Sequence, residues 1–233
     1  WHGDHVLGIP GLLQTLIQSN YSKTLEIYGP KGTKSYFSKM MDAFDIRGHM
    51  INYKIKEIKG GKIFDDKEFY LEAFRLDHGS CYGYNFIEKD RRKINLKKFG
   101  LKSDPILKKL QEGKDIIWEG KKIKAKDATT LVKGKKVCIV SDTGKCDNIT
   151  KFGKKSDLMI CEATLMHELK DITKERKHLT SVQAAECAKK AKVKSLILTH
   201  FSQRYNDVKY LLKEAKAKFK ETKAASDFLK ISL

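Results

Sequence analysis

Trp1-His2-Gly3-Asp4-His5 opens the chain and leads directly into the apolar run Val6-Leu7-Gly8-Ile9. Three side chains of this opening stretch can ligate a metal, and they are His2, Asp4 and His5. Two imidazoles and one carboxylate are too few ligands to complete one zinc site, and a pair of zinc sites would need even more. The stretch therefore predicts that further ligands come from distant parts of the chain.

The composition predicts one large domain and a negatively charged partner. The chain has 233 residues, 40% of them hydrophobic, which is enough for a single domain with a sizeable core. Its 48 Lys and Arg residues outnumber 29 Asp and Glu residues, giving a formal net charge of +19. Such an excess indicates RNA, DNA or anionic lipid as a partner. A lysine-rich surface adapted to salt or heat is the alternative explanation.

The five cysteines are odd in number and widely spaced, so they fit neither a disulfide framework nor a Cys-x-x-Cys metal motif. They indicate reduced core residues in a cytoplasmic protein. No apolar run approaches the roughly 18 residues of a membrane span, and no membrane partner is expected. The sequence begins without Met and inside a motif, which predicts that it is a piece of a longer protein.

Four short apolar segments each end in a residue that can bind a metal or transfer a proton. The segments, with the residue that follows or closes each, are 69–76 with His78, 137–141 with Asp142, 158–161 with Glu162 and 196–199 with His200. Any one of these segments is weak evidence for a site, because polar residues are common at the ends of strands. Together with the opening stretch they favour a site at the C-terminal ends of strands, where α/β folds build their sites.

Apolar residues at helical spacing predict helices over 10–18, 33–44 and 207–221, and a final strand is expected over 228–233. His49 lies in a polar loop, where a surface or packing role is favoured over metal binding.

Residues 89–136 are strongly basic, with 17 Lys or Arg residues against 6 Asp or Glu residues. The part at about 89–113 is expected to form a protruding, mobile arm with a short helix over 105–110, and 116–123 a hairpin that returns to the core. A solvated face is the alternative, but charge beside a metal site favours phosphate binding. The candidate RNA-binding residues of this arm are Arg91, Arg92, Lys93, Lys97, Lys98, Lys108 and Lys109.

The candidates for the chemistry form a metal set and a proton-transfer pair. The possible metal ligands are His2, Asp4, His5, His78, Asp142 and His200. Imidazoles with carboxylates suit Zn²⁺ in a hydrolytic site, and two metals about 3.5 to 4 Å apart can share a carboxylate and a bridging hydroxide that attacks phosphorus. Phosphodiester cleavage also needs a proton for the departing oxygen, and His178 with Glu162 is the available pair. Position alone leaves open whether His178 faces a cleft or is an ordinary loop residue.

These motifs resemble the metallo-β-lactamase superfamily and, within it, the short bacterial and archaeal tRNA 3′-processing endoribonucleases, RNase Z or tRNase Z. The opening stretch is similar to the H-x-H-x-D-H signature without its first histidine. Cys161-Glu162-Ala163-Thr164 resembles the family's H-E-A-T segment, and His178-Leu179-Thr180 its H-S-T segment. Asp104-Pro105 stands where the family's arm has a Gly-Pro element, so the grip of the arm differs in detail.

The resemblance implies an α/β fold, the four-layer αββα sandwich, whose N-terminal strands are missing from the given chain. It also implies that His2 and His78 bind one zinc, that Asp4, His5 and His200 bind a second, and that Asp142 bridges them. Asp4, Glu162 and His178 are then the catalytic residues, and Arg204 contacts RNA phosphate. Family members are homodimers, in which the arm of one subunit serves the active site of the other.

The implied function is zinc-dependent removal of the 3′ trailer from precursor tRNA, by a metal-bridging hydroxide that leaves a 3′-OH on the tRNA. The alternatives are a metallo-β-lactamase-fold phosphodiesterase for small substrates and a non-catalytic basic RNA-binding module. Because the first signature histidine is not in the sequence, we expect the isolated chain to fill its two metal sites unequally. It is expected to show weak catalysis or none.

Overall fold

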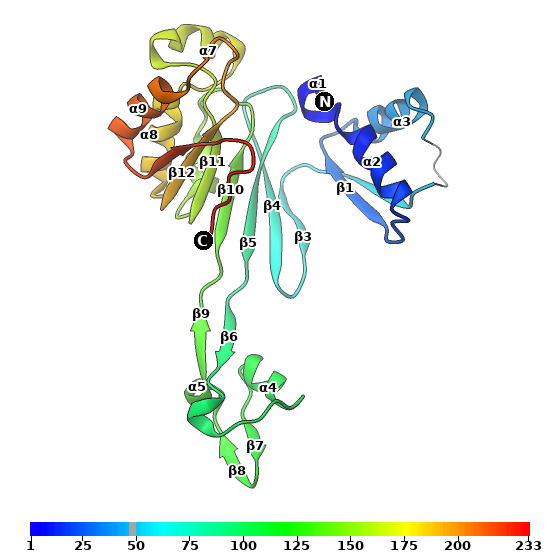
Figure 1. The fold of residues 1–233 in the computed structure, drawn as a ribbon, viewed down its shortest axis with the longest axis vertical. Helices are drawn as coiled ribbons and strands as arrows, with labels where there is room; N and C mark the ends of the chain where they lie inside the picture. The colour runs from blue at the N-terminus through cyan, green and yellow to red at the C-terminus, as the bar shows by residue number, and fades with distance from the viewer. Residues whose placement is uncertain (47–49) are drawn as a thin grey trace.

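The computed structural model describes residues 1–46 and 50–233, and His49 lies outside them. Its central element is a seven-stranded sheet with the strand order β13-β12-β11-β10-β5-β4-β3 (Figure 1). These strands are β3 (Gly61–Asp65), β4 (Phe69–Arg75), β5 (Tyr82–Glu88), β10 (Lys136–Val140), β11 (Leu158–Glu162), β12 (Ser195–Thr199) and β13 (Thr222–Ala224).

The direction of the strands brings the predicted site residues to one edge of the sheet. Strands β10, β11 and β12 are parallel neighbours, and β5 is antiparallel to both β10 and β4. Strand β4 therefore runs in the same direction as β10, β11 and β12. The four strand ends singled out in the sequence consequently lie along the same edge, as expected.

Helices α6 (Asp147–Gly153), α8 (Ser181–Ala191) and α9 (Lys209–Lys218) pack on one face of this sheet (Figure 1). The main core joins sheet residues such as Met159 and Leu196 to the small residue Ala188 of α8, which lets helix and sheet approach closely. The predicted capping box is present, since Thr180 accepts from the backbone N–H of Gln183 and Gln183 accepts from that of Thr180. Among the described residues, no helix is both long and apolar enough to cross a membrane.

A smaller sheet and the helices that pack on it cover the opposite face of the seven-stranded sheet. Strands β1 (Leu25–Gly29) and β2 (Tyr53–Glu57) pair in parallel, and α2 (Ile9–Gln18) and α3 (Thr33–Ala43) pack on them, with α1 (Gly3–Val6) at the start. A small apolar cluster joins the two sheets through Tyr28 of β1 and Tyr82 of β5. The order helix, sheet, sheet, helix is the layering that the sequence implied.

The basic segment projects far from the two sheets (Figure 1). Strands β6 (Arg91–Ile94) and β9 (Thr129–Val132) pair to form its stalk. Its far end holds η1 (Lys97–Phe99), α4 (Leu107–Gln111), β7 (Ile116–Trp118), β8 (Lys121–Ile123) and α5 (Ala125–Ala128). We call residues 90–133 the arm. The hairpin β7–β8, expected to return to the core, lies instead at the far end, because Ile116 packs with Leu110 of α4 in a separate apolar cluster.

The C-terminal segment also differs from the expectation. Residues 228–233 form no strand, and Phe228 is 97% exposed. The strand beside β12 is β13, and not the predicted segment. Helix α7 (Lys170–Arg176), preceded by η2 (His167–Leu169), completes the described elements near the site.

Candidate metal centre and proton donor

Four of the predicted ligands converge at the strand-end edge. Nε2 of His5 lies 3.1 Å from Oδ2 of Asp142 and 3.5 Å from Oδ2 of Asp4. Nε2 of His200 lies 3.4 Å from Oδ1 of Asp142 and 3.8 Å from Oδ2 of Asp4. One ligand atom from each of these residues lies within 4.8 Å of those from the other three. The four side chains can thus surround a single cation.

Each of these side chains is delivered by a short local structure. Asp4 and His5 share the single turn of α1, and Asp142 lies two residues after the end of β10. His200 follows β12 with φ of +59°, in the left-handed region that few residues other than glycine adopt. Asp142 is buried, whereas Asp4 and His5 are exposed, so the centre opens to solvent on the side of α1.

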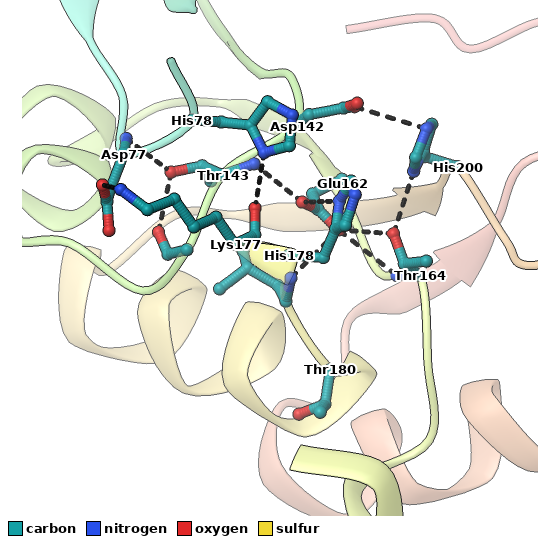
Figure 2. Close-up of polar contacts among 12 residues, drawn as sticks. Asp77, His78, Asp142, Thr143, Glu162, Thr164, Lys177, His178, Thr180 and His200 are labelled. Atoms are coloured by element: carbon teal, nitrogen blue, oxygen red, sulfur yellow. Dashed lines mark hydrogen bonds and ion pairs between the residues drawn. The ribbon is translucent and has the colours of Figure 1, made fainter. Parts of the chain in front are cut away.

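His2 and His78 lie next to this group. Their rings meet edge to face with centroids 5.2 Å apart, and His78 also forms a possible metal-binding group with Asp142 and His178. Nδ1 of His78 lies 2.9 Å from the backbone oxygen of Lys177, which can only accept, so Nδ1 donates (Figure 2). Nε2 of His78 is therefore left unprotonated in the neutral ring and can ligate a metal.

His178 and Glu162 form a closely held pair. Nδ1 of His178 lies 2.9 Å from Oε1 of Glu162, whose side chain is 1% exposed. The hydrogen bond that Nδ1 of His178 donates to Glu162 raises the pKa of His178, although burial lowers it. The ring of His178 lies 5.0 Å from that of His78 and 5.3 Å from that of His200, centroid to centroid. An imidazole with a raised pKa is thus held beside the metal ligands.

Both carboxylate oxygens of Glu162 accept hydrogen bonds from the surrounding loops. Its Oε1 accepts from the backbone N–H of Thr143 at 2.7 Å, and its Oε2 accepts from that of Leu179 at 3.1 Å. The hydroxyl of Thr164 donates to Oε2 at 2.7 Å and lies 2.9 Å from Nδ1 of His200 (Figure 2). One buried carboxylate therefore ties together the loops after β10, β11 and α7.

Asp142 remains ionised despite its burial. Burial raises the pKa of its carboxyl group, but the hydrogen bond to His5 and the charge of His200 outweigh this and leave the pKa below its usual value. A carboxylate held in the charged form between imidazoles is suited to bind a cation.

Sequence reasoning assigned no role to three residues that support the site. The hydroxyl of Thr143 accepts from the backbone N–H of Asp77 at 3.0 Å, and Lys177 holds His78 through its backbone oxygen. Thr164 links Glu162 to His200. Thr143 and Thr164 lie one and two residues after site residues, and that nearness is the only sequence signal they carry.

The predicted RNA-binding residues lie in two places. Arg91 and Lys93 on β6, Lys97 and Lys98 on η1, and Lys108 and Lys109 on α4 are exposed on the arm. Arg92 is half-buried, and its guanidinium donates to Oγ1 of Thr129 at 3.0 Å across the stalk. Arg204 is exposed in the loop after β12, close along the chain to His200, and so belongs to the body and not to the arm.

Comparisons with known proteins agree with the geometry. No protein-family model matches the chain. Ribonuclease Z of Bacillus licheniformis is 37% identical over 238 residues, spanning 97% of this chain and 76% of the relative. The crystal structure of human tRNase Z, short form, matches with a TM-score of 0.66 and 27% identity over 100% of this chain and 76% of that one. The metallo-β-lactamase fold protein YhfI of Bacillus subtilis has a TM-score of 0.64 at 21% identity, covering 97% and 71% of the two chains. The expected fold is confirmed.

Proposed function

The chain belongs to the ribonuclease Z family of metal-dependent tRNA 3′-processing endoribonucleases, and we propose that its strand-end cluster is the centre that removes the 3′ trailer from precursor tRNA. The observation that carries the proposal is the meeting of Asp4, His5, Asp142 and His200, with ligand atoms within 4.8 Å, beside a histidine held by a buried carboxylate. Metal ligation and proton donation are thus available at one place.

The residues fit zinc. The donors are imidazole nitrogens and carboxylate oxygens, and Nε2 of His78 is kept free for a metal by the hydrogen bond at Nδ1. In the proposed centre His2 and His78 would hold one zinc, and Asp4, His5 and His200 would hold a second. Asp142, which lies within a group of ligand atoms on each side, would be shared between the two sets. When bound, the metal would activate water as the nucleophile and neutralise charge on the phosphate.

The chain's own residues supply the proton. Glu162 raises the pKa of His178, which favours its protonated form, and it binds Nδ1, so that Nε2 on the opposite side of the ring can donate to the oxygen that leaves phosphorus. That oxygen becomes the 3′-OH of the tRNA. Asp4, exposed at the mouth of the centre, is proposed as the carboxylate that accepts the proton of the attacking water.

The arm is proposed to bind the body of the tRNA through its exposed Lys and Arg side chains. Binding through this positive charge does not depend on the RNA sequence, because contacts to phosphate position a nucleic acid without reading its bases. The separate apolar cluster around Leu110 gives the arm a fixed shape of its own. A phosphodiesterase for small esters has no use for such a projection, which favours the nuclease.

Two wider proposals rest on the family. We propose a cytoplasmic homodimer, supported by the reduced cysteines and by two exposed leucines near the N-terminus, Leu7 at 71% and Leu12 at 55% exposure. Light scattering during gel filtration tests the dimer. Replacing both leucines with glutamate should yield monomers, and an unchanged mass would exclude this surface.

The proposed reaction is tested on a precursor tRNA with a labelled 3′ trailer, using the protein loaded with zinc. A single cut at the start of the trailer is expected, leaving a 3′-OH on the tRNA and a 5′-phosphate on the trailer. This cut should be slow for the given chain, which does not contain the first signature histidine. Cuts scattered through the tRNA, or cleavage that survives removal of metal by a chelator, would refute the proposal.

A further inference from the structure

The Thr164 hydroxyl stands between the proton donor and the metal centre. Oγ1 lies 2.7 Å from Oε2 of Glu162 and 2.9 Å from Nδ1 of His200. Glu162 in turn bonds Nδ1 of His178 at 2.9 Å. Three hydrogen bonds therefore run without a gap from His178 through Glu162 and Thr164 to His200, and Figure 2 shows the row.

The donor and the acceptor of each hydrogen bond in this row follow from the number of hydrogens that each group carries. A hydroxyl carries one hydrogen, and a carboxylate oxygen can only accept, so Thr164 gives its hydrogen to Glu162. The lone pair of the hydroxyl is then what faces His200, and Nδ1 of His200 must be the donor. The neutral ring is held as the Nδ1–H tautomer, with its bare Nε2 directed at Asp142 and Asp4.

His200 differs in this from His78. Nδ1 of His78 is held by a backbone oxygen, that of Lys177, which no substitution of a side chain removes. The corresponding contact of His200 is made by a side chain. The backbone of His200 is also in the left-handed region, which few residues other than glycine adopt.

We propose that Thr164 is a positioning residue that fixes the tautomer of His200 and joins the proton-donating pair to the metal centre. The inference rests on the proposed function, because it takes His200 as a metal ligand. It assigns to Thr164 a contribution to metal affinity through His200 and a contribution to the proton donor through Glu162. Hydrogen-bond partners of ligating histidines typically change metal affinity by about 10- to 100-fold.

Zinc affinity of the protein, measured by competition with a chromophoric chelator, tests this. Thr164→Val keeps the shape but lacks the hydroxyl, and it should bind zinc about 10- to 100-fold more weakly. Thr164→Ser keeps the hydroxyl and should stay within about threefold of the unaltered protein. Equal affinity of the valine variant and the unaltered protein would overturn the proposal, and so would equal losses in the valine and serine variants.

A second readout separates a fixed tautomer from a general loosening. In ¹⁵N-labelled protein without zinc, the neutral ring of His200 should show a protonated Nδ1 in the unaltered and serine forms and a mixture of tautomers in the valine form. A protonated Nδ1 in all three would contradict the role given to Thr164. If the valine variant fails to fold by circular dichroism, Thr164→Ala is judged by the same two measurements.

The zinc and NMR experiments use no RNA. A protein that binds zinc as described but leaves precursor tRNA uncut would therefore overturn the proposed function alone. Conversely, normal cleavage with unchanged zinc affinity in Thr164→Val would overturn the role of Thr164 alone.

Discussion

Nδ1 of His178 lies 2.9 Å from Oε1 of Glu162, so a fully buried carboxylate orients the histidine and raises its pKa. The same carboxylate accepts from the loop that carries Asp142, through the backbone N–H of Thr143. The proton donor and the metal centre are therefore parts of one hydrogen-bonded frame.

Glu162→Gln should shift the pH dependence of cleavage. The carboxylate raises the pKa of His178, so the protonated form needed for donation survives to higher pH, and the rate falls as pH rises through that pKa. In Glu162→Gln, which lacks the carboxylate charge, the cleavage rate should begin to fall at lower pH and should be about 100-fold lower at pH 8. The pH profile of kcat on precursor tRNA measures this. The exposed Glu168→Gln serves as control, and a Glu162→Gln profile that matches it would contradict the role of the pair.

Removing the arm should abolish tRNA cleavage and spare the chemistry. Glu88 donates its backbone N–H to the oxygen of Lys135 at 2.8 Å, so the ends of the arm already meet and a short Gly-Ser turn can replace residues 91–132. Cleavage of precursor tRNA should fall on the order of 100-fold, because the phosphate contacts are lost. Hydrolysis of bis(p-nitrophenyl) phosphate should persist. Undiminished tRNA cleavage would contradict the role given to the arm.

Charge on the arm can be tested without deleting it. Lys108→Ala with Lys109→Ala should raise KM for precursor tRNA and make binding less sensitive to salt, since about one counterion is released per phosphate contact. Lys216→Ala with Lys218→Ala removes the same charge from α9 and should have little effect. Equal effects of the two pairs would indicate that only the overall charge matters.

The buried cysteines should resist alkylation while the protein is folded. Burial raises the pKa of Cys138 to about 12 and that of Cys187 to about 11, and it also raises that of Cys161. Thiolate is the reactive form, so iodoacetamide at pH 8 should modify these three only after unfolding. Mass spectrometry before and after guanidinium treatment checks this. Rapid labelling of Cys138 in protein with an unchanged circular dichroism spectrum would contradict the buried core.

The edge of the sheet was predictable because its signal is local. In β11, Leu158, Met159 and Cys161 are all buried, so the strand appears in the sequence as an unbroken apolar run that stops at Glu162. Parallel neighbours then require the ends of such runs to share one edge. The capping box at Thr180 was predictable for the same reason, since both of its partners lie within four residues.

What escaped prediction depends on contacts between distant segments. Thr164 and His200 are 36 residues apart, and no pattern around either one records that the hydroxyl meets the ring. The structure of the arm was predicted only in part, because its core is small. The hairpin over 116–123 has the same alternation of apolar and polar residues whether it packs on α4 or on the main sheets. The predicted strand over 228–233 was wrong because the segment that pairs with β12 is Thr222–Ala224, and the choice between two neighbouring segments depends on contacts with a distant strand.

Single-turnover cleavage of a trailer-bearing precursor tRNA by Asp142→Ala tests most directly whether the strand-end cluster is the catalytic centre. Asp142 lies 3.1 Å from His5 and 3.4 Å from His200 and belongs to two of the possible metal-binding groups. The rate should fall on the order of 1000-fold, with RNA binding through the arm retained. Cleavage at the same position and at the rate of the unaltered protein would contradict the proposed centre.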